Sequence, residues 1–512
     1  MKIDTILSVD IGTSFVKAGL YTGEGVCLCV HREKTTQSYR NGALVQEADD
    51  YIDKFVSVVR TLMVCAQAEN ASVKAVAFTG QMAGVVGVDS DLNAVTDWSG
   101  TVDSRQDLSM SSEADIAKVA AISGTNTPIF AKKLKWFEAQ LGNDAGKVRK
   151  YIGIIGYVIA KISQAAVEDT VMQATNLAFT GIADMRKLSW SGELCRVFDI
   201  YTKQLPRVVH ATQIVGHLSR SFAQACGLAQ GTPIVAGAGD KIASCIGLGL
   251  VNPGGLADES STVGAMTLCV DRYKPNDTDR SLEVIPGAER GQYYMMFYIA
   301  GSGVAVDWYI KTFACMEQQK ADKECIDVHK LLESEAARVA VGSDNLMCVG
   351  LLGGRSLPFT PSIRGAWIGH SFSHTSAHFY RSLLEGIAFE YKRSVDVMRK
   401  EFSHLNIDKI HVLGGGGKSA LWNSIKADIM KADYQTLERS DLTLLGTSII
   451  GGSAIGMYKS ISEGTKHAAK IKDTYKVDEA NSEEYQEIYS TYIDVLEANS
   501  KIYEQLQKRR NK

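Results

Sequence analysis

The stretch Thr5-Ile-Leu-Ser-Val-Asp10-Ile-Gly-Thr-Ser14-Phe-Val-Lys-Ala-Gly-Leu-Tyr21 holds two apolar runs on either side of a short turn. Residues 5–10 and 15–21 have the apolar content of strands, and the small residues of 11–14 favour a tight reversal between them. A third run of this kind, 26–32, follows Thr22-Gly-Glu-Gly25. The start of the chain therefore predicts an antiparallel meander.

A helix and a further strand follow the meander. Apolar residues recur at helical spacing between about residues 46 and 70, and residues 73–78 form an apolar run that enters Gly80. These periods predict an amphipathic helix and a strand. Meander, helix and strand together predict an α/β layer.

The second half of the chain repeats this order. Strand-like runs occupy 256–270 and 293–299, a helical pattern occupies 376–401, and the strand-like run 407–413 enters Gly414-Gly-Gly-Gly417. An approximate duplication with a changeover near residue 245 predicts two lobes, 1–245 and 246–512, which face a shared cleft.

Asp10 ends the first strand and is followed by Ile11-Gly12-Thr13-Ser14. Backbone N–H groups of such a turn can face a phosphate, and a carboxylate at this place can hold Mg²⁺. An Asp-x-Gly hairpin turn with no ligand is the structural alternative.

Gly237-Ala-Gly-Asp240 joins the strand-like run 232–236 to an apolar helix over 241–248. A helix N-terminus keeps a carboxylate ionised, which suits a general base, and the glycines leave room for a substrate hydroxyl. A purely structural N-cap is the alternative. The glycine run 414–417, followed by Lys418 and Ser419, can accept an adenine or ribose against its backbone, or can be only a flexible turn.

Taken together, these segments resemble the FGGY family of carbohydrate kinases over nearly the whole chain. The family's phosphate loops are similar to 10–14 and to Thr262-Val-Gly264, and its catalytic aspartate segment is similar to 231–240. Its second-lobe signature resembles Arg364-Gly-Ala-Trp-Ile-Gly369 and the residues that follow, and its adenosine segment resembles 414–419.

The resemblance implies a fold of two ribonuclease-H-like lobes, as in the actin, hexokinase and Hsp70 superfamily, with a cleft between them. It implies an ATP-dependent, Mg²⁺-dependent sugar kinase with Asp240 as catalytic base and as a substrate contact, and with Asp10 at the metal. The implied nucleotide-binding residues are Gly12, Thr13, Ser14, Thr262, Gly264, Gly415, Gly416, Lys418 and Ser419. The implied sugar contacts are Gln81, Met82, Asp103 and Arg105.

The xylulokinase-like branch is the most similar, because Gly80-Gln-Met-Ala-Gly84 resembles its sugar motif and Asp103-Ser-Arg105 its Asp-x-Arg contact. Ala83 stands where that motif has His, which puts xylulose itself in question and leaves related ketoses and polyols open. Two further departures are Ser261 in the second phosphate loop and Phe130 in the first-lobe signature.

Charge and composition argue against several other classes of protein. The formal charge is −3 with no basic stripe, and no run of about 18 apolar residues occurs, so we expect neither a nucleic-acid nor a membrane partner. The N-terminus carries no targeting signal, which predicts a cytoplasmic protein. The ten cysteines lack metal-site spacing and are expected to be buried, reduced thiols.

Two rival classes remain open alongside the kinase: a non-catalytic sugar-sensing or scaffold relative, and an ATP-driven conformational machine of the Hsp70 or actin type. Intact Asp10 and Asp240 argue against the first, and the sugar elements at 81–82 and 103–105 argue against the second. The expected partner is a small sugar. The oligomeric state stays open, a homodimer included.

Overall fold

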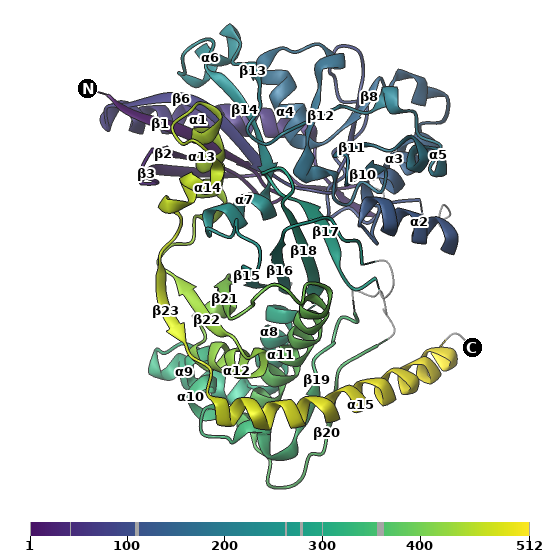
Figure 1. Ribbon diagram of the computed structural model, residues 1–512, viewed down its shortest axis with the longest axis vertical. Coiled ribbons are helices and arrows are strands. Elements are labelled where there is room, and N and C mark those ends of the chain that lie inside the picture. The colour runs from purple at the N-terminus through teal and green to yellow at the C-terminus, as the bar shows by residue number, and fades with distance from the viewer. Residues whose placement is uncertain are drawn as a thin grey trace.

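The computed structural model describes residues 2–40, 42–107, 112–261, 264–276, 280–299, 301–355 and 363–510. Two lobes, each built around one large sheet, lie one above the other in Figure 1. This agrees with the predicted α/β, two-lobe architecture. The division of the chain at residues 245 and 246 stays a prediction.

The first lobe contains a six-stranded sheet with the order β13-β14-β6-β1-β2-β3. The antiparallel pairs β1–β2 and β2–β3 confirm the predicted meander, and β6 runs parallel to β1. The strands of this sheet are β1 (Ile3–Ile11), β2 (Phe15–Thr22), β3 (Cys27–Lys34), β6 (Ala71–Gly80), β13 (Ile214–His217) and β14 (Pro233–Gly239).

The second lobe contains a seven-stranded sheet with the order β17-β18-β16-β15-β21-β22-β23. Its β15 pairs antiparallel with β16 and parallel with β21, which repeats the pairing of β1 with β2 and β6. The strands of this sheet are β15 (Leu256–Ser260), β16 (Gly264–Val270), β17 (Glu283–Pro286), β18 (Tyr293–Ile299), β21 (Lys409–Leu413), β22 (Asp433–Leu437) and β23 (Ile471–Tyr475).

Helices cover both faces of the first sheet, so β1 is buried on both sides after its first two residues. Leu7 packs in one apolar cluster with Phe55 of α1 (Ala48–Ala68), whereas its neighbour Ile6 packs in another with Ile449 of α13 (Leu442–Ala454). Successive side chains of a strand point to opposite faces, which explains the alternation.

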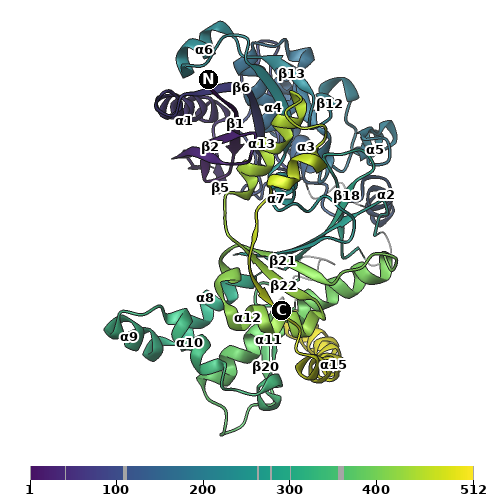
Figure 2. The ribbon, with the colours of Figure 1, turned by 60° about the vertical axis from the view of Figure 1, so that its left-hand side comes forward.

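Helix α13 belongs to the second half of the sequence but packs against the first lobe, beside β1 and α7 (Asp240–Gly247) in Figures 1 and 2. Hydrogen bonds hold the residues just before α13 against the first lobe. The Tyr21 hydroxyl donates to Asp441 Oδ2 at 2.6 Å, and Arg439 Nη1 donates to the Gly25 carbonyl at 2.9 Å. The chain therefore crosses between the lobes more than once.

The remaining elements connect and cover these sheets. The other helices are α2 (Glu113–Ser123), α3 (Ile129–Leu141), α4 (Ile154–Ser163), α5 (Gly192–Val197), α6 (Arg220–Cys226), α8 (Ser302–Phe313), α9 (Cys315–Glu324), α10 (Val328–Ala336), α11 (Ser376–Glu401), α12 (Ala420–Met430), α14 (Ile461–Gly464) and α15 (Glu479–Arg510). The short strands are β4 (Ser38–Arg40), β5 (Ala43–Val45), β7 (Val86–Val88), β8 (Lys150–Ile152), β9 (Val171–Gln173), β10 (Ala183–Asp184), β11 (Ser189–Trp190), β12 (Arg207–Val209), β19 (Met347–Val349) and β20 (Ala366–Ile368). The 3₁₀ turns are η1 (Gly142–Lys147), η2 (Val167–Asp169), η3 (Ala174–Leu177), η4 (Thr202–Gln204), η5 (Val341–Asn345), η6 (Gly415–Lys418) and η7 (Thr465–His467).

Four of the cysteines depart from expectation. Cys29 of β3 and Cys65 of α1 form a disulfide, and Cys315 and Cys325 are exposed. The expectation of buried, reduced thiols is therefore wrong for these four. Because α1 packs on β3, it brings together two cysteines that are 36 residues apart in sequence.

Among the described residues, none of the helices has the length and apolar content needed to cross a bilayer.

Candidate active site

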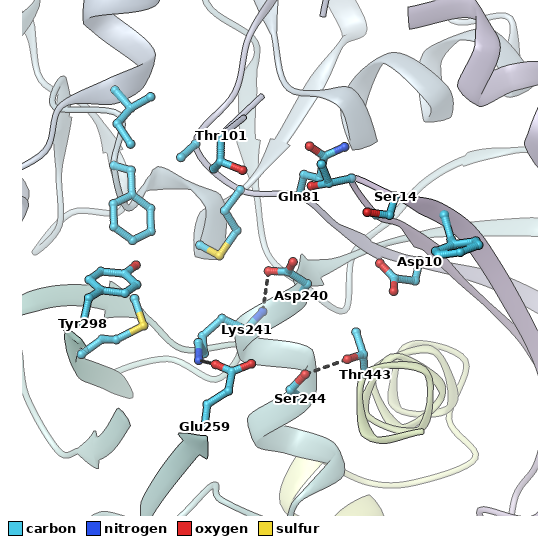
Figure 3. Close-up of a pocket in the computed structure, with 18 of the residues that line it drawn as sticks. Asp10, Ser14, Gln81, Thr101, Asp240, Lys241, Ser244, Glu259, Tyr298 and Thr443 are labelled. Carbon is cyan, nitrogen blue, oxygen red and sulfur yellow. Dashed lines mark hydrogen bonds and ion pairs between the residues drawn. The ribbon is translucent and has the colours of Figure 1, made fainter. Parts of the chain in front are cut away.

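A cavity of about 710 Å³ lies where the two lobes meet (Figure 3). Its walls come from the ends of β1, β6 and β14, from α7 and α13, and from β15 and β18 of the second sheet. The lining residues are Asp10, Gly12, Thr13, Ser14, Phe15, Lys17, Gln81, Met82, Ala83, Thr101, Thr127, Ile129, Phe179, Asp240, Lys241, Ser244, Glu259, Met296, Tyr298 and Thr443.

Asp10 reaches the cavity from the carboxyl end of β1, just before the turn to β2. The turn closes with a hydrogen bond from the Gly12 N–H to the Phe15 carbonyl at 3.1 Å. A Cβ on Gly12 would stand 2.8 Å from that carbonyl oxygen, so the turn needs glycine. Burial raises the pKa of Asp10, and the ammonium of Lys17, 3.7 Å away, partly offsets this. Sequence reasoning did not find Lys17.

Asp240 is the first residue of α7 and follows β14, whose Gly239 pairs in register with Gly80 of β6. Its Oδ1 accepts the Lys241 N–H at 2.7 Å, but Gly239 occupies the N-cap position and the helix has no side-chain cap bond, so Asp240 is not the N-cap that the structural alternative required. Figure 3 shows the carboxylates of Asp240 and Asp10 facing one space.

The surroundings of Asp240 disfavour its charged form. Burial, and next the charge of Asp10, raise the pKa of Asp240 to about 7. A base with a pKa close to neutral pH is well matched to take a proton from a reacting hydroxyl. The site therefore has a carboxylate suited to proton transfer beside a second carboxylate suited to a cation.

Two polar contacts lie between segments that line the cavity, and the first of them joins the two lobes. Lys241 of α7 forms an ion pair with Glu259 of β15, and Ser244 Oγ lies 2.7 Å from Thr443 Oγ1 of α13. Sequence reasoning missed all four residues, because each pair joins segments that are far apart in the chain. The adjacency of Lys241 to Asp240 was the one local signal.

The predicted sugar contacts separate into two groups. Gln81 and Met82 line the cavity, whereas Asp103 and Arg105 are absent from its lining. The Arg105 guanidinium donates to both carboxylate oxygens of Asp103 at 2.9 and 2.8 Å, and Lys133 Nζ donates to the Asp103 carbonyl at 2.6 Å. Asp103 and Arg105 thus bind each other beside the cavity.

One wall of the cavity is apolar and was not foreseen. It consists of Met82, Ala83, Ile129, Phe179 and Met296, with Tyr298 at its edge. Ala83 and Phe179 hold left-handed backbone conformations, with φ of 60° and 65°, which non-glycine residues adopt at a cost and often at functional sites. The sequence indicated only two of these residues, Met82 as a predicted sugar contact and Ala83 as a departure from the sugar motif.

A second cavity of about 520 Å³ lies in the other lobe and contains the predicted adenosine segment. Gly415, Gly416, Lys418 and Ser419 all line it. The segment contains the 3₁₀ turn η6, and Ser419 Oγ accepts the Trp422 N–H at 3.1 Å to cap α12. The other lining residues are Ser260, Ser261, Gly303, Val306, Asp307, Asp327, His329, Lys330, Glu333, Tyr380, Leu384 and Trp422.

The end of β15 connects the two cavities, because Glu259 lines the first and Ser260 and Ser261 line the second. Of the predicted second phosphate loop, Thr262 lies outside the described residues. Gly264 begins β16, where a Cβ would stand 2.2 Å from the Tyr391 hydroxyl, and it lines neither cavity.

Within the described ranges, no cluster of three or more His, Cys, Asp or Glu side chains is arranged to hold a metal ion. A single buried carboxylate such as Asp10 fits Mg²⁺, which usually takes one or two protein carboxylates and completes its shell with water and substrate phosphates.

The chain matches known proteins over almost its full length. Residues 5–247 match the family model for the N-terminal domain of the FGGY family of carbohydrate kinases, and residues 257–455 match the model for the C-terminal domain. A gluconokinase of Bacillus subtilis is 25% identical over 98% of this chain and 97% of its own. A xylulose kinase of the same organism is 23% identical over 96% of each.

Solved structures agree in fold. A ligand-bound xylulose kinase from Lactobacillus acidophilus superposes with a TM-score of 0.86 at 21% identity, over 98% of this chain and all of the other. A glycerol kinase from Plasmodium falciparum, solved with ADP, gives 0.84 at 16% identity over 97% and 98%. The two-domain fold of actin and hexokinase is therefore shared.

Proposed function

The chain belongs to the FGGY family of carbohydrate kinases, and from this premise we propose that it transfers the γ-phosphoryl group of ATP to a hydroxyl of a small ketose or polyol, with Asp240 as the base. The observation that carries the proposal is the position of Asp240. It is half-buried where both lobes meet, its pKa is raised to about 7, and a second carboxylate, Asp10, faces the same space.

In the proposed reaction the substrate hydroxyl lies against Asp240. Its oxygen attacks the γ-phosphorus, the bond from that phosphorus to the bridging oxygen breaks, and ADP leaves. Asp240 Oδ takes the hydroxyl proton. Positioning and charge neutralisation supply most of the catalysis in such transfers.

The other predicted residues divide between the phosphates and the nucleoside. Asp10 would hold Mg²⁺, which neutralises phosphate charge when bound, and the backbone N–H groups of 12–14 would donate to phosphate oxygens. Lys17 and Lys241 add positive charge to the same walls. Gly415, Gly416, Lys418 and Ser419 would contact the adenosine in the second cavity.

The sugar itself differs, in our proposal, from D-xylulose. Ala83 removes a donor from the sugar motif, and Asp103 and Arg105 satisfy each other rather than facing the cavity. A site that hydrogen-bonds a hydroxyl discriminates by about 10⁴ or more, so the loss of such contacts redirects specificity.

The test is a coupled assay of ADP release with ketoses, polyols and sugar acids, run on wild type, Asp240→Asn and the exposed control Asp53→Asn of α1. We expect sugar-dependent ADP release, a loss of about 10²–10⁴-fold in kcat for Asp240→Asn, and no change for Asp53→Asn. Thermal melts and ATP titrations on the same samples establish that the variants are folded and bind nucleotide. If Asp240→Asn keeps more than about a tenth of wild-type kcat, outside that range, Asp240 is not the base.

A further inference from the structure

We infer that the substrate carries a deoxygenated carbon, a methyl or methylene group, at the end remote from the phosphorylated hydroxyl, and that this carbon packs against Ile129, Phe179 and Met296. This inference rests on the proposed function and narrows its substrate to deoxy-ketoses and deoxy-polyols.

The apolar wall is continuous with the core of the protein. Met82, Phe179 and Met296 belong to one buried cluster, and Ala83 and Tyr298 pack against it. The wall is also built from both lobes, because the Phe179 ring of the first lobe lies 6.4 Å from the Tyr298 ring of β18. Its chemistry is therefore fixed by tertiary packing and does not come from one mobile side chain.

The wall begins beside Asp240 and extends away from Asp10 to Tyr298 at its edge. Figure 3 shows Tyr298 on one side and Asp10 and Ser14 on the other, with Asp240 between them. Met82 lies beside the base, since a Cβ on Gly239 would stand 2.6 Å from the Met82 sulfur. A substrate with its reacting hydroxyl at Asp240 would thus extend along apolar side chains.

Few polar groups near the wall are free to bind hydroxyls. The Gln81 amide already donates to the Tyr51 hydroxyl at 2.7 Å and accepts from Trp98 Nε1 at 3.3 Å. The Thr127 hydroxyl donates to Glu283 at 3.0 Å. The hydroxyl of Tyr298 lies at the edge of this wall, and Thr101 supplies a further hydroxyl to the cavity lining. Burial raises the pKa of Tyr298 well above its ordinary value, so its hydroxyl stays neutral.

The wall should make the deoxy substrate preferred without excluding the hydroxylated one. A hydroxyl held against Ile, Phe and Met side chains loses its water without gaining a partner, whereas a methyl group there gains apolar burial. Apolar pockets discriminate against an added hydroxyl by roughly 10²-fold at most, so we expect a ratio of about 10–100 in kcat/KM.

The experiment compares substrates that differ in one hydroxyl: L-fuculose with L-tagatose, L-rhamnulose with L-fructose, and 1-deoxy-D-xylulose with D-xylulose. Release of ADP is measured for each with the full-length protein. We expect the deoxy member of at least one pair to have the higher kcat/KM, by about 10-fold or more.

Matched variants test whether the wall causes the preference. Ile129→Thr and Ile129→Val have nearly the same shape and differ by one hydroxyl, so Thr should lower the deoxy-to-hydroxy ratio about 10-fold and Val should preserve it. Met296→Gln against Met296→Leu repeats the test at a second position. Ile122→Thr, at a partly buried residue outside the cavity, is the control for a general effect on the fold.

Each outcome decides the question. Equal or higher kcat/KM for the hydroxylated member of all three pairs overturns the inference and leaves the kinase standing. A preference that is unchanged by both Ile129→Thr and Met296→Gln overturns its assignment to this wall. No release of ADP with any sugar overturns the proposed function together with the inference.

Discussion

Asp240 has two neighbours that act on it in opposite senses. Asp10 raises its pKa, and the Lys241 N–H at 2.7 Å stabilises its charge, but burial is the largest effect and leaves the pKa at about 7. A carboxylate in water would be ionised at every physiological pH. At this residue the protonation state changes in the range where the enzyme would work.

The first prediction is the pH dependence of the reaction. Only ionised Asp240 can accept a proton, so kcat/KM should fall about tenfold per pH unit below a midpoint of about 7 and be level above it. The measurement is the ADP assay from pH 5.5 to 8.5 with the best sugar, the coupling enzymes being checked at each pH. A level profile over this range would contradict the assignment.

The second prediction concerns Gly415, one of the glycines that line the second cavity. A Cβ added there meets nothing within 4 Å, so Gly415→Ala should melt like wild type. If adenosine lies against this backbone, the new methyl group takes its space, and the KM for ATP should rise about tenfold while the KM for sugar stays unchanged.

Gly23→Ala is the matched control for this change. Its Cβ also meets nothing within 4 Å, and Gly23 lies in the turn after β2, away from both cavities. An unchanged KM for ATP in the Gly415 variant would remove this glycine from the nucleotide site.

At the scale of elements, β17 joins the second sheet to a loop of the first lobe. Glu283 accepts the Asn126 N–H at 3.1 and 3.0 Å and the Thr127 hydroxyl at 3.0 Å, and the Val284 N–H donates to the Gly124 carbonyl at 2.9 Å. Burial raises the pKa of Glu283 to about 7 despite these donors. The contact between the two lobes at β17 thus contains a carboxyl group that titrates near neutral pH.

The third prediction follows from the direction of the pKa shift of Glu283. The unfolded chain ionises near pH 4.5 and the folded chain near 7, so the free energy of unfolding should fall as the pH rises between these values. Glu283→Gln does not titrate. The free energy of unfolding of Glu283→Gln, measured relative to that of wild type, should therefore rise by about 2 kcal/mol between pH 5 and pH 8.

The control for Glu283 is Glu497→Gln on the exposed side of α15, which should track wild type at every pH. Parallel melting curves for wild type and Glu283→Gln across this range would mean that Glu283 titrates normally.

The fourth prediction concerns the link between β3 and α1. Alkylation of the denatured protein should modify eight cysteines without reductant and ten after reduction, because Cys29 and Cys65 are paired. Closing a loop of this length is worth at most about 4 kcal/mol, so reductant should lower the Tm of wild type but not that of Cys65→Ser. Ten modified cysteines before reduction would contradict the pairing.

At the scale of the whole molecule, the two cavities that we propose for the sugar and the adenosine differ in their place between the lobes. The first cavity takes its lining from both lobes, and the second lies in the C-terminal lobe alone. Cleft closure would exclude water, which competes with the sugar as phosphoryl acceptor.

The fifth prediction is that ATP and sugar together compact the protein more than either alone. Small-angle scattering on the four ligand states should show the smallest radius of gyration with both bound. Asp240→Asn can be used to prevent turnover during the measurement. A radius that is the same in all four states would argue against closure.

The sequence alone determined the features that depend on neighbours in the chain. Alternation and helical spacing predicted the meander, α1 and the bounds of α11, because secondary structure leaves its period in the local sequence. Asp10, Asp240 and the glycines at 415 and 416 were identifiable because a strand end followed by small residues is a local pattern.

Only the tertiary structure decided which distant residues meet. It set Lys241 against Glu259 and Ser244 against Thr443, and it left Asp103 and Arg105 out of the cavity lining. It also packed α13 on the first lobe and joined Cys29 to Cys65. The physical reason is that these contacts arise from packing between elements, whose partners leave no period or spacing in the sequence of either segment.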